Sequence, residues 1–291
     1  MSANIITEIA KAKINLTLHV GRTIADPHDR FYGYHPVDSL VVFADTGDKL
    51  HVSESRKARL SITGYFGSSL AVTSDNLISR AINAVEEKTT LPSFDIKLEK
   101  NLPVASGIGG GSADAAAMLR LLKPYADLTR SEWHDIAVAL GADVLVCYLS
   151  QTAHMTGIGE SVTPMPDLGK VHGILVNPAI GVSTRDIFRA YDAGSVEETP
   201  RPQLSDGSLP EKALNGRNDL QIPAIENEPV IQTVINEIAG QNGCQLARMS
   251  GSGATCFGLF KTKNETELAV QNIKRQFKDW WCVPTILGDI E

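Results

Sequence analysis

The middle of the chain carries the glycine-rich stretch Pro103-Val104-Ala105-Ser106-Gly107-Ile108-Gly109-Gly110-Gly111-Ser112-Ala113-Asp114-Ala115-Ala116. Four glycines fall within five positions, so the backbone can approach a ligand closely and adopt the positive φ angles that point several N–H groups inward. The alanine- and leucine-rich run 112–122 predicts a helix whose positive dipole end faces the same point. We therefore expect a phosphate-binding loop; the alternatives are a flexible linker or a tight strand-to-helix turn.

The order of residues in this loop excludes the two commonest phosphate-binding motifs. No lysine follows the last glycine, as the motif Gly-x-x-x-x-Gly-Lys-Ser/Thr requires. No acidic residue ends a second strand at the distance expected of a dinucleotide-binding fingerprint.

Composition sets the broad class of the protein. With 291 residues, 43% of them hydrophobic, the chain can build two compact domains or one large domain. The net charge of -7 argues against a nucleic-acid or anionic-membrane surface. The N-terminus has no signal-peptide pattern, no apolar run is long enough to span a bilayer, and the four cysteines lie far apart without C-x-x-C spacing. We therefore expect a cytoplasmic protein without a disulfide framework or a zinc site.

The N-terminal segment from Ile9 to Val20 alternates between apolar and polar residues, which predicts a strand. Lys13 and Asn15 lie on the same side of that strand, about 7 Å apart, so one ligand could touch both. An ordinary exposed polar face would give the same alternation.

An aromatic cluster follows at Arg30-Phe31-Tyr32-Gly33-Tyr34-His35-Pro36, broken by a glycine and closed by a proline. This pattern predicts a loop that displays rings. Tyr34 and His35 offer flat faces with polar tips, which suit a heterocyclic base, although a structural cluster at a hairpin explains the residues equally well.

The remaining elements of the first half are predicted from apolar periodicity and capping patterns. Asp143 lies in Gly141-Ala142-Asp143-Val144, directly after a helix predicted to begin at Thr129. It is either a simple cap or a base whose position is fixed by the apolar run Val144 to Leu149 behind it. The predicted strands are 49–53, 59–63 and 94–98, and the predicted helices are 76–87, 112–122 and one beginning at the capping box of Thr129 and Glu132.

The second half predicts strands at 171–176, 245–250, 255–260 and 281–287 and helices at 183–191, 229–239 and 264–277. This order approximates a split β-α-β unit, a four-stranded sheet with helices on one face. We expect a domain boundary near Gly157 to Pro166, giving domains 1–160 and 161–291, and a long mobile insertion from Gly194 to Gly216, which is rich in Pro, Ser, Glu and Asp.

A second glycine loop, Met249-Ser250-Gly251-Ser252-Gly253-Ala254-Thr255, joins two of these strands. It is longer than a two-residue hairpin, so it is either a bulged turn or a second phosphate-binding loop. Two such loops in one chain suggest a polyphosphate ligand.

Three separated blocks, Ala12 to Leu16, Pro103 to Ala116 and Met249 to Thr255, together resemble the three signature motifs of the GHMP kinases. Within that family, Gly33-Tyr34-His35, Gly141 to Val144 and Asn218-Asp219-Leu220 are similar to the branch that phosphorylates a cytidine-diphosphate-linked methylerythritol in the non-mevalonate isoprenoid pathway. The resemblance spans nearly the whole chain.

The resemblance implies an α+β fold of two domains, the first with a left-handed β-α-β crossover and the second a ferredoxin-like split β-α-β domain. It also implies an ATP-dependent kinase that uses Mg²⁺, acts on a small molecule and is a monomer or weak homodimer. Asp143 would accept the proton of the substrate hydroxyl, and Lys13 would hold that carboxylate and stabilise the transferred charge.

The resemblance further implies binding roles for two sets of residues. Tyr34 and Phe188 would sandwich the cytosine, His35 would hydrogen-bond to it, Asn15 would contact the polar tail of the substrate, and Gly251 and Gly253 would lie at the substrate end of the cleft. Asn76 and Lys100 would lie near the adenine, and Ser112 near the phosphates and Mg²⁺. The remaining ATP-binding residues implied are Pro103, Ser106, Gly107, Gly109, Gly110 and Gly111.

The sequence departs from the family pattern in three places. Ala113-Asp114 replaces a Ser-Ser or Ser-Asn type of pair, which leaves open which hydroxyl meets the metal. Leu145 replaces a common proline at what we expect to be a strand entry, and residues 23–32 lengthen the loop before Gly33. The alternatives to the cytidine substrate are another GHMP kinase of mevalonate-like or homoserine-like alcohols, or a non-catalytic nucleotide-binding regulator.

Overall fold

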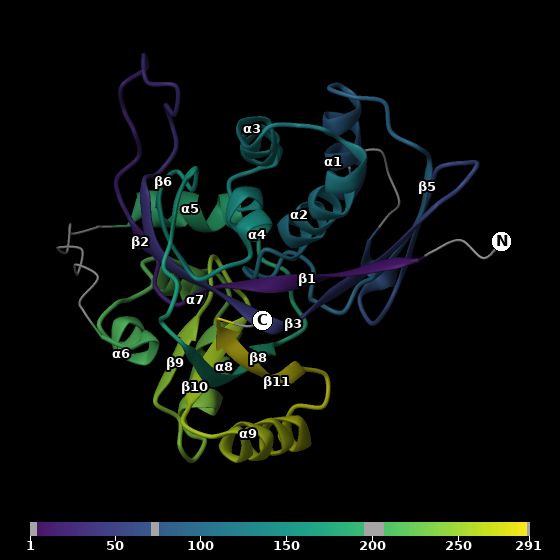
Figure 1. Cartoon of the computed structure of the whole chain (residues 1–291). Helices are drawn as coiled ribbons and strands as arrows, with labels where there is room; N and C mark the ends of the chain where they lie inside the picture. The colour runs from purple at the N-terminus through teal and green to yellow at the C-terminus, as the bar shows by residue number, and fades with distance from the viewer. Residues whose placement is uncertain (1–4, 71–75, 195–206, 290–291) are drawn as a thin grey trace. The chain divides into compact units, whose positions relative to one another are not determined.

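The computed structural model describes residues 5–70, 76–194 and 207–289 of the chain (Figure 1). The chain packs into two compact units, each built from separate segments. Unit 1 comprises the described residues of 1–12, 46–104 and 109–150, and unit 2 those of 13–45, 105–108 and 151–291. The domain boundary near residue 160 stays a prediction.

Unit 1 pairs three strand segments and packs a group of helices. Residues 49–54 of β3 pair antiparallel with β5, and β5 pairs parallel with β4. Its elements are β1 (Ile6–Asn15), of which 6–12 belong here, the end of β3 (Val37–Glu54), β4 (Arg59–Thr63), η1 (Gly67–Ser69), α1 (Leu77–Glu86), β5 (Phe94–Glu99), α2 (Gly110–Leu122), η2 (Lys123–Tyr125), α3 (Arg130–Leu140) and α4 (Val144–Leu149).

Helix α2 lies at the centre of unit 1, in contact with α1, α3 and α4. Ala115, Ala116 and Ala117 are completely buried, as are Met118 and Leu119 next to them. A helix that is apolar on all sides is stable only inside a core, and alanine at these positions lets neighbouring helices approach closely. The predicted helix is confirmed, and it begins two residues earlier than expected, at Gly110.

The predicted helix starts in unit 1 are confirmed by their caps. Asn76 caps α1 by accepting a hydrogen bond from the Ile78 N–H at 2.9 Å. At the start of α3, the Thr129 hydroxyl accepts from the Glu132 N–H at 3.3 Å, and the Glu132 carboxylate accepts from the Thr129 N–H at 2.9 Å, which completes a capping box.

The C-terminal part of unit 2 is a four-stranded antiparallel sheet in the order β11-β8-β10-β9. With α8 and α9 this is the ferredoxin-like order of a split β-α-β unit, so that prediction is confirmed. Helices α8 and α9 contact each other and the strands of the sheet (Figure 1). The elements are β8 (Lys170–Asn177), α5 (Thr184–Ala193), α6 (Leu209–Leu214), α7 (Gln221–Asn227), α8 (Val230–Ala239), β9 (Leu246–Met249), β10 (Cys256–Phe260), α9 (Lys263–Gln276) and β11 (Trp281–Gly288).

The other strands of unit 2 pair with the first part of β3 or with each other. Strand β2 (His19–Val20) pairs with Val37 and Asp38, and β6 (Ala153–Gly157) pairs with residues 37–41. Strand β7 (Ser161–Pro164) pairs with β6 and completes a hairpin that the sequence patterns did not predict. Further along β3, Ala44 pairs with Leu287 of β11.

Three expectations about local structure are wrong. The run Val144 to Leu149 is helix α4, so Leu145 does not stand at a strand entry. The predicted strand 9–20 is interrupted after Asn15 and resumes as β2. The insertion predicted for 194–216 contains helix α6, begun by a capping box of Ser208 and Glu211, while residues 195–206 lie outside the described part of the chain. Among the described residues, no helix is long and apolar enough to cross a membrane.

Candidate active site

The three motif blocks of the sequence contribute segments that meet within unit 2. The Lys13 N–H donates a hydrogen bond to the Ile108 carbonyl at 3.0 Å, which joins strand β1 to the first glycine loop. The Ser250 hydroxyl accepts from the Asn15 N–H at 3.1 Å and donates to the Gly107 carbonyl at 3.1 Å. Ser250 therefore links the N-terminal strand to both glycine loops.

The two glycine loops approach each other too closely for a side chain at Gly107. Gly107 has a φ of +75°, and a Cβ atom there would lie 2.7 Å from the Gly253 nitrogen and in conflict with the Ser250 carbonyl. The Thr255 N–H donates to the Ser106 carbonyl at 3.1 Å, which closes the second side of the contact. The second glycine loop therefore packs directly against the first, in addition to joining β9 to β10.

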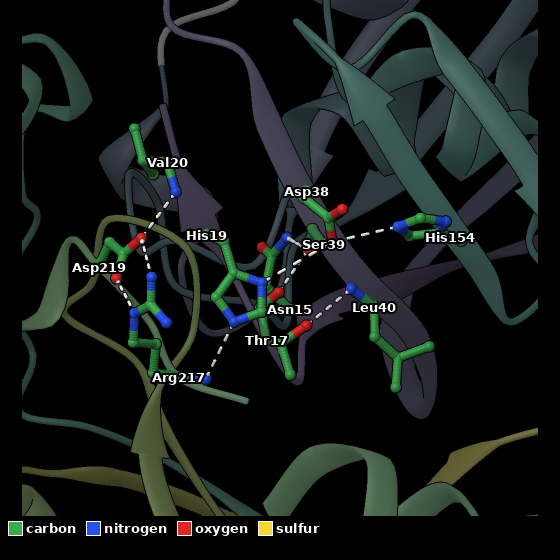
Figure 2. Close-up of polar contacts among 10 residues, drawn as sticks. All are labelled: Asn15, Thr17, His19, Val20, Asp38, Ser39, Leu40, His154, Arg217 and Asp219. Atoms are coloured by element: carbon green, nitrogen blue, oxygen red, sulfur yellow. Dashed lines mark hydrogen bonds and ion pairs between the residues drawn. The ribbon is translucent and has the colours of Figure 1, made fainter. Parts of the chain in front are cut away.

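Lys13 and Asn15 point the same way, as their alternation predicted, but both are buried. The Lys13 ammonium donates to Asn15 Oδ1 at 2.9 Å, and the Asn15 amide donates to the Ser39 hydroxyl at 2.7 Å. Ser39 in turn donates to the Thr17 carbonyl (Figure 2). Only 3% of Lys13 and 1% of Asn15 is exposed, so this polar chain holds a lysine in a fixed position within the core.

The part of the first glycine loop that belongs to unit 1 forms the start of α2. Gly109 adopts the left-handed conformation (φ 64°, ψ 22°) and caps the helix, and its carbonyl accepts the N–H of Ala113 at 2.8 Å. Gly110 and Ser112 are half-buried and Gly111 is exposed, while Pro103 before the loop is buried. The first N–H groups of an α-helix have no partner within the helix, so this turn can bind an anion.

Lys100 lies beneath this turn with its ammonium between two buried carboxylates. Its Nζ is 2.5 Å from Asp48 Oδ2 and 2.7 Å from Asp114 Oδ2, and only 2% of the lysine side chain is exposed. The second Asp48 oxygen accepts from the Asn101 N–H at 2.5 Å and the Leu102 N–H at 2.8 Å. The predicted place of Lys100 beside the adenine stays a prediction, and the structure shows an ion triad beneath the start of α2.

The triad has an uneven charge balance, because one ammonium faces two carboxylates. Burial, together with the Asp48 charge, outweighs the attraction of Lys100 and raises the pKa of Asp114 to about 8. Burial alone would lower the pKa of Lys100, but the Asp114 and Asp48 charges offset it and raise that pKa. Asp114 was noted in the sequence only as a departure from the family pattern; a charged residue inside an alanine-rich helix was the signal that it needs a buried partner.

Asp143 stands directly before α4, where the sequence allowed either a cap or a base. Its backbone carbonyl accepts the N–H of Cys147 at 3.1 Å, so the residue occupies the N-cap position. Within the described part of the chain, its side chain makes no capping hydrogen bond to that helix. Its predicted role as the base stays a prediction.

The aromatic residues predicted to bind a base come together in part. The rings of His35 and Phe188 have centroids 5.0 Å apart and are tilted by 34°, and Tyr191 meets His35 edge-on at 5.8 Å. The His35 Nδ1 donates to the Gly21 carbonyl at 3.0 Å, and its Nε2 lies 3.3 Å from Asp192. Tyr34 is 58% exposed beside this group, as expected for a ring displayed on a loop.

A second histidine group, which the sequence did not suggest, lies on strands β2, β3 and β6 (Figure 2). Asp38 Oδ1 is 3.1 Å from His154 Nε2 and 3.7 Å from His19 Nδ1. The Arg217 N–H donates to His19 Nε2 at 3.4 Å, so that nitrogen is an acceptor. Burial and the Arg217 charge lower the pKa of His19, which keeps the ring neutral near pH 7.

Comparison with known proteins agrees with the contacts found between the three motif blocks. The family model described as "GHMP kinases N terminal domain" matches residues 76–151, and "GHMP kinases C terminal" matches residues 200–279. A protein of Parvibaculum lavamentivorans, named 4-diphosphocytidyl-2-C-methyl-D-erythritol kinase, is 44% identical and aligns over 97% of this chain and 98% of its own. The chain belongs to the GHMP kinase family. Membership of the GHMP kinases implies ATP as the phosphoryl donor.

Other GHMP kinases align with this chain over nearly its whole length and support the same family assignment. A protein of Paracoccus denitrificans with the same name is 45% identical over 97% of this chain and 96% of its own. The solved structure titled 4-(cytidine 5'-diphospho)-2C-methyl-D-erythritol kinase superposes with a TM-score of 0.76 at 27% identity, over 98% of this chain and 100% of the other. The two-domain α+β GHMP kinase fold expected from the sequence is thus confirmed.

Proposed function

We propose that the protein is an ATP-dependent kinase that phosphorylates the 2-hydroxyl of 4-diphosphocytidyl-2-C-methyl-D-erythritol in the non-mevalonate pathway to isoprenoid precursors. The observation that carries the proposal is the hydrogen bonding of Lys13 to Ile108 and of Asn15 to Ser250, whose hydroxyl in turn donates to Gly107. The names of relatives more than 40% identical over nearly the whole chain support the choice of substrate.

The ATP site proposed here is centred on the glycine loop and the start of α2. Gly109, Gly110 and Gly111 would present backbone N–H groups to the phosphates together with Ser106, Gly107 and Ser112. Asn76, Lys100 and Pro103 would flank the adenine end. Mg²⁺ would be held mainly by the phosphates, as is usual in kinases, with the Ser112 hydroxyl as a candidate ligand.

In the proposed reaction, Asp143 accepts the proton of the substrate hydroxyl as the hydroxyl oxygen bonds to the γ-phosphorus of ATP, and the bond from that phosphorus to the bridging oxygen breaks to release ADP. Lys13 neutralises negative charge during the transfer, and Asn15 holds the lysine ammonium at 2.9 Å. Phosphoryl transfer needs little covalent chemistry from the protein, so positioning and charge neutralisation supply most of the rate enhancement.

The proposed cytosine site consists of His35, Phe188 and Tyr34. The 5.0 Å contact of His35 with Phe188 supports it, because it brings the proposed hydrogen-bonding ring next to one of the two rings proposed to stack on the base. Asn15, Gly251 and Gly253 would contact the polyol and phosphate part of the substrate. We propose a cytoplasmic monomer or weak homodimer that needs neither nucleic acid nor membrane.

The proposal is tested by measuring ADP release from ATP and Mg²⁺ over a panel of alcohols. The panel contains 4-diphosphocytidyl-2-C-methyl-D-erythritol, the same polyol without its cytidine diphosphate, mevalonate and homoserine. We expect turnover only with the first compound. Turnover of mevalonate or homoserine alone would assign the chain to another branch of the family, and ATP binding without any turnover would favour a regulator.

The variant Asp143→Asn is the control for chemistry in this assay. An amide cannot accept the proton at neutral pH, so turnover should fall by roughly 10²–10⁴-fold while ATP still binds. Near-normal turnover would remove Asp143 from the role of base without touching the choice of substrate.

A further inference from the structure

The segment Arg217-Asn218-Asp219 is fixed beside the strand that carries Lys13 and Asn15. The Leu18 N–H donates to the Arg217 carbonyl at 2.8 Å, and the Asp219 N–H donates to the Leu18 carbonyl at 2.9 Å. Asp219 Oδ2 accepts from the Val20 N–H at 2.8 Å, and its other oxygen pairs with the Arg217 guanidinium at 2.5 Å (Figure 2). The backbone of Asn218 therefore has a defined position.

The Asn218 side chain reaches from this segment into the second glycine loop. Its amide nitrogen donates to the Met249 carbonyl and to the Gly251 carbonyl, both at 2.8 Å. Its amide oxygen accepts from the Leu220 N–H at 3.0 Å. Two carbonyl partners can be satisfied only by an NH₂ group, so the orientation of the amide is determined by its surroundings.

The two carbonyls that Asn218 holds flank Ser250. This serine is the residue whose hydroxyl accepts from the Asn15 N–H and donates to the Gly107 carbonyl. Fixing residues 249 and 251 leaves residue 250 little freedom, because one residue between two anchored peptides has few allowed φ/ψ combinations. Asn218 therefore controls the link between strand β1 and the first glycine loop.

Arg248 secures the base of the same loop. Its buried guanidinium donates to the carbonyls of Leu16, Ala213 and Gly216 at 2.7, 2.8 and 2.7 Å. Burial lowers the pKa of Arg248 to about 10, so the group stays charged near pH 7 and its donors stay in place. Gly216 directly precedes Arg217, so the loop and the Asn218 segment are tied together at a second point.

We propose that Asn218 is a positioning residue for phosphoryl transfer: it sets the loop 249–253 so that Ser250 holds Asn15 and Gly107 in register. The inference rests on the proposed kinase activity. It assigns a task to the Asn218 side chain, which the sequence showed only within the family-like segment Asn218-Asp219-Leu220. The expected consequence is a dependence of kcat on the polarity of the Asn218 side chain, more than on its size.

Two variants separate polarity from packing. Asn218→Asp keeps the shape but turns carboxylate oxygens toward the Met249 and Gly251 carbonyls, whereas Asn218→Ala leaves those carbonyls unpaired without repelling them. We expect kcat to fall by about 100-fold in Asn218→Asp, the loss typical of a displacement near 1 Å, and by less in Asn218→Ala. A role in packing alone predicts the opposite order, because aspartate fills the site and alanine does not.

Asp219→Asn is the matched control, because the backbone hydrogen bonds of the segment to Leu18 and all contacts of the Asn218 side chain remain. It keeps an oxygen for the Val20 N–H and loses the ion pair with Arg217, so Tm should fall while kcat stays near that of the wild type. Loss of kcat in Asp219→Asn equal to that in Asn218→Asp would overturn the inference, as would a kcat for Asn218→Asp equal to or above that of Asn218→Ala.

A double-mutant cycle with Ser250→Ala tests the route of the effect and does not depend on Asn218→Asp folding. If Asn218 acts through Ser250, the loss of kcat in Asn218→Ala/Ser250→Ala is smaller than the product of the two single losses. Multiplicative losses would overturn the inference. An inactive wild-type chain would instead overturn the proposed function, which distinguishes the two failures.

Discussion

Lys100→Met removes the cation from the ion triad of Lys100, Asp48 and Asp114 and retains most of the apolar stem. The ammonium is 2.5 and 2.7 Å from the two carboxylates, and no more than 5% of any of the three side chains is exposed. Removing one partner of a buried ion pair costs about 3–5 kcal/mol, because a charge is left buried without compensation.

The structure favours the lower end of that range. The pKa of Asp114 is raised to about 8, so near pH 7 this carboxyl already holds its proton, and replacing Lys100 leaves no buried charge at Asp114. Asp48 keeps its hydrogen bonds from the Asn101 and Leu102 N–H groups, which partly replace the lost ammonium. We therefore expect the free energy of unfolding to fall by about 3 kcal/mol, which lowers a urea midpoint by about 1 M if m is about 3 kcal/mol/M.

Urea unfolding followed by circular dichroism measures this loss, with Lys97→Met as the matched control. Lys97 is exposed on β5, three residues before Lys100, so its replacement should change stability by less than about 0.5 kcal/mol. The double variant Lys100→Met/Asp48→Asn should regain part of the loss, because it also removes the uncompensated charge. Equal midpoints for Lys100→Met and Lys97→Met would refute the reasoning.

Four further predictions concern the loop and its surroundings. In the native protein Asp114 holds its proton up to about pH 8, whereas in the unfolded chain its pKa is the ordinary 3.8, so wild-type stability should fall as pH rises through this window. Urea unfolding at pH 6 and 8.5 should show the stability of Asp114→Asn rising relative to that of the wild type. The pH dependence of stability due to His19 has the opposite sign, because its lowered pKa keeps the ring neutral in the folded protein. The wild type should therefore lose stability below pH 6.5, and His19→Gln should lose less stability than the wild type between pH 7.5 and 5.5. Gly107→Ala should abolish turnover and lower Tm, whereas Gly169→Ala, with a φ of +77° and no atom within 4 Å of the added Cβ, should lower Tm only slightly. Tyr34→Ala should raise KM for the cytidine substrate by the equivalent of roughly 1–3 kcal/mol, and an unchanged KM would argue against stacking.

The elements that the sequence predicted are those specified by local patterns. Helices α1, α3 and α9 carry caps within four residues of their starts, and the strands of the ferredoxin-like sheet carry runs of apolar residues between turn signals. Helix α4 has only six residues, all apolar or aromatic, and such a run does not distinguish a short helix from a buried strand. Helix α6 begins with a capping box, but it has only six residues and follows a Pro- and Ser-rich stretch, so the sequence did not predict it.

The parts of the site that the sequence did not predict depend on partners far apart in the chain. Lys100 and Asp48 are 52 residues apart, and Asn218 and Gly251 are 33 residues apart. Nothing in a local pattern marks Asp48, which lies in the 18-residue strand β3, of which the sequence predicted only residues 49–53. Gly47 beside it must be a glycine because a Cβ there would meet the backbone of Ala10, and a close approach of two strands is one reason for a glycine inside a strand.

The glycines of the first loop answer different physical requirements, although the sequence shows them as one motif. Gly107 is needed because the Ser250 carbonyl and Gly253 leave no room for a Cβ, whereas Gly109 is needed for its left-handed conformation at the start of α2. A Cβ on Gly110 would lie 3.2 Å from the Lys100 ammonium, so this position is constrained by the ion triad below the loop. The motif therefore combines a loop-to-loop contact, a helix cap and a buried charge network, and each of its glycines is required by a different one of these three features.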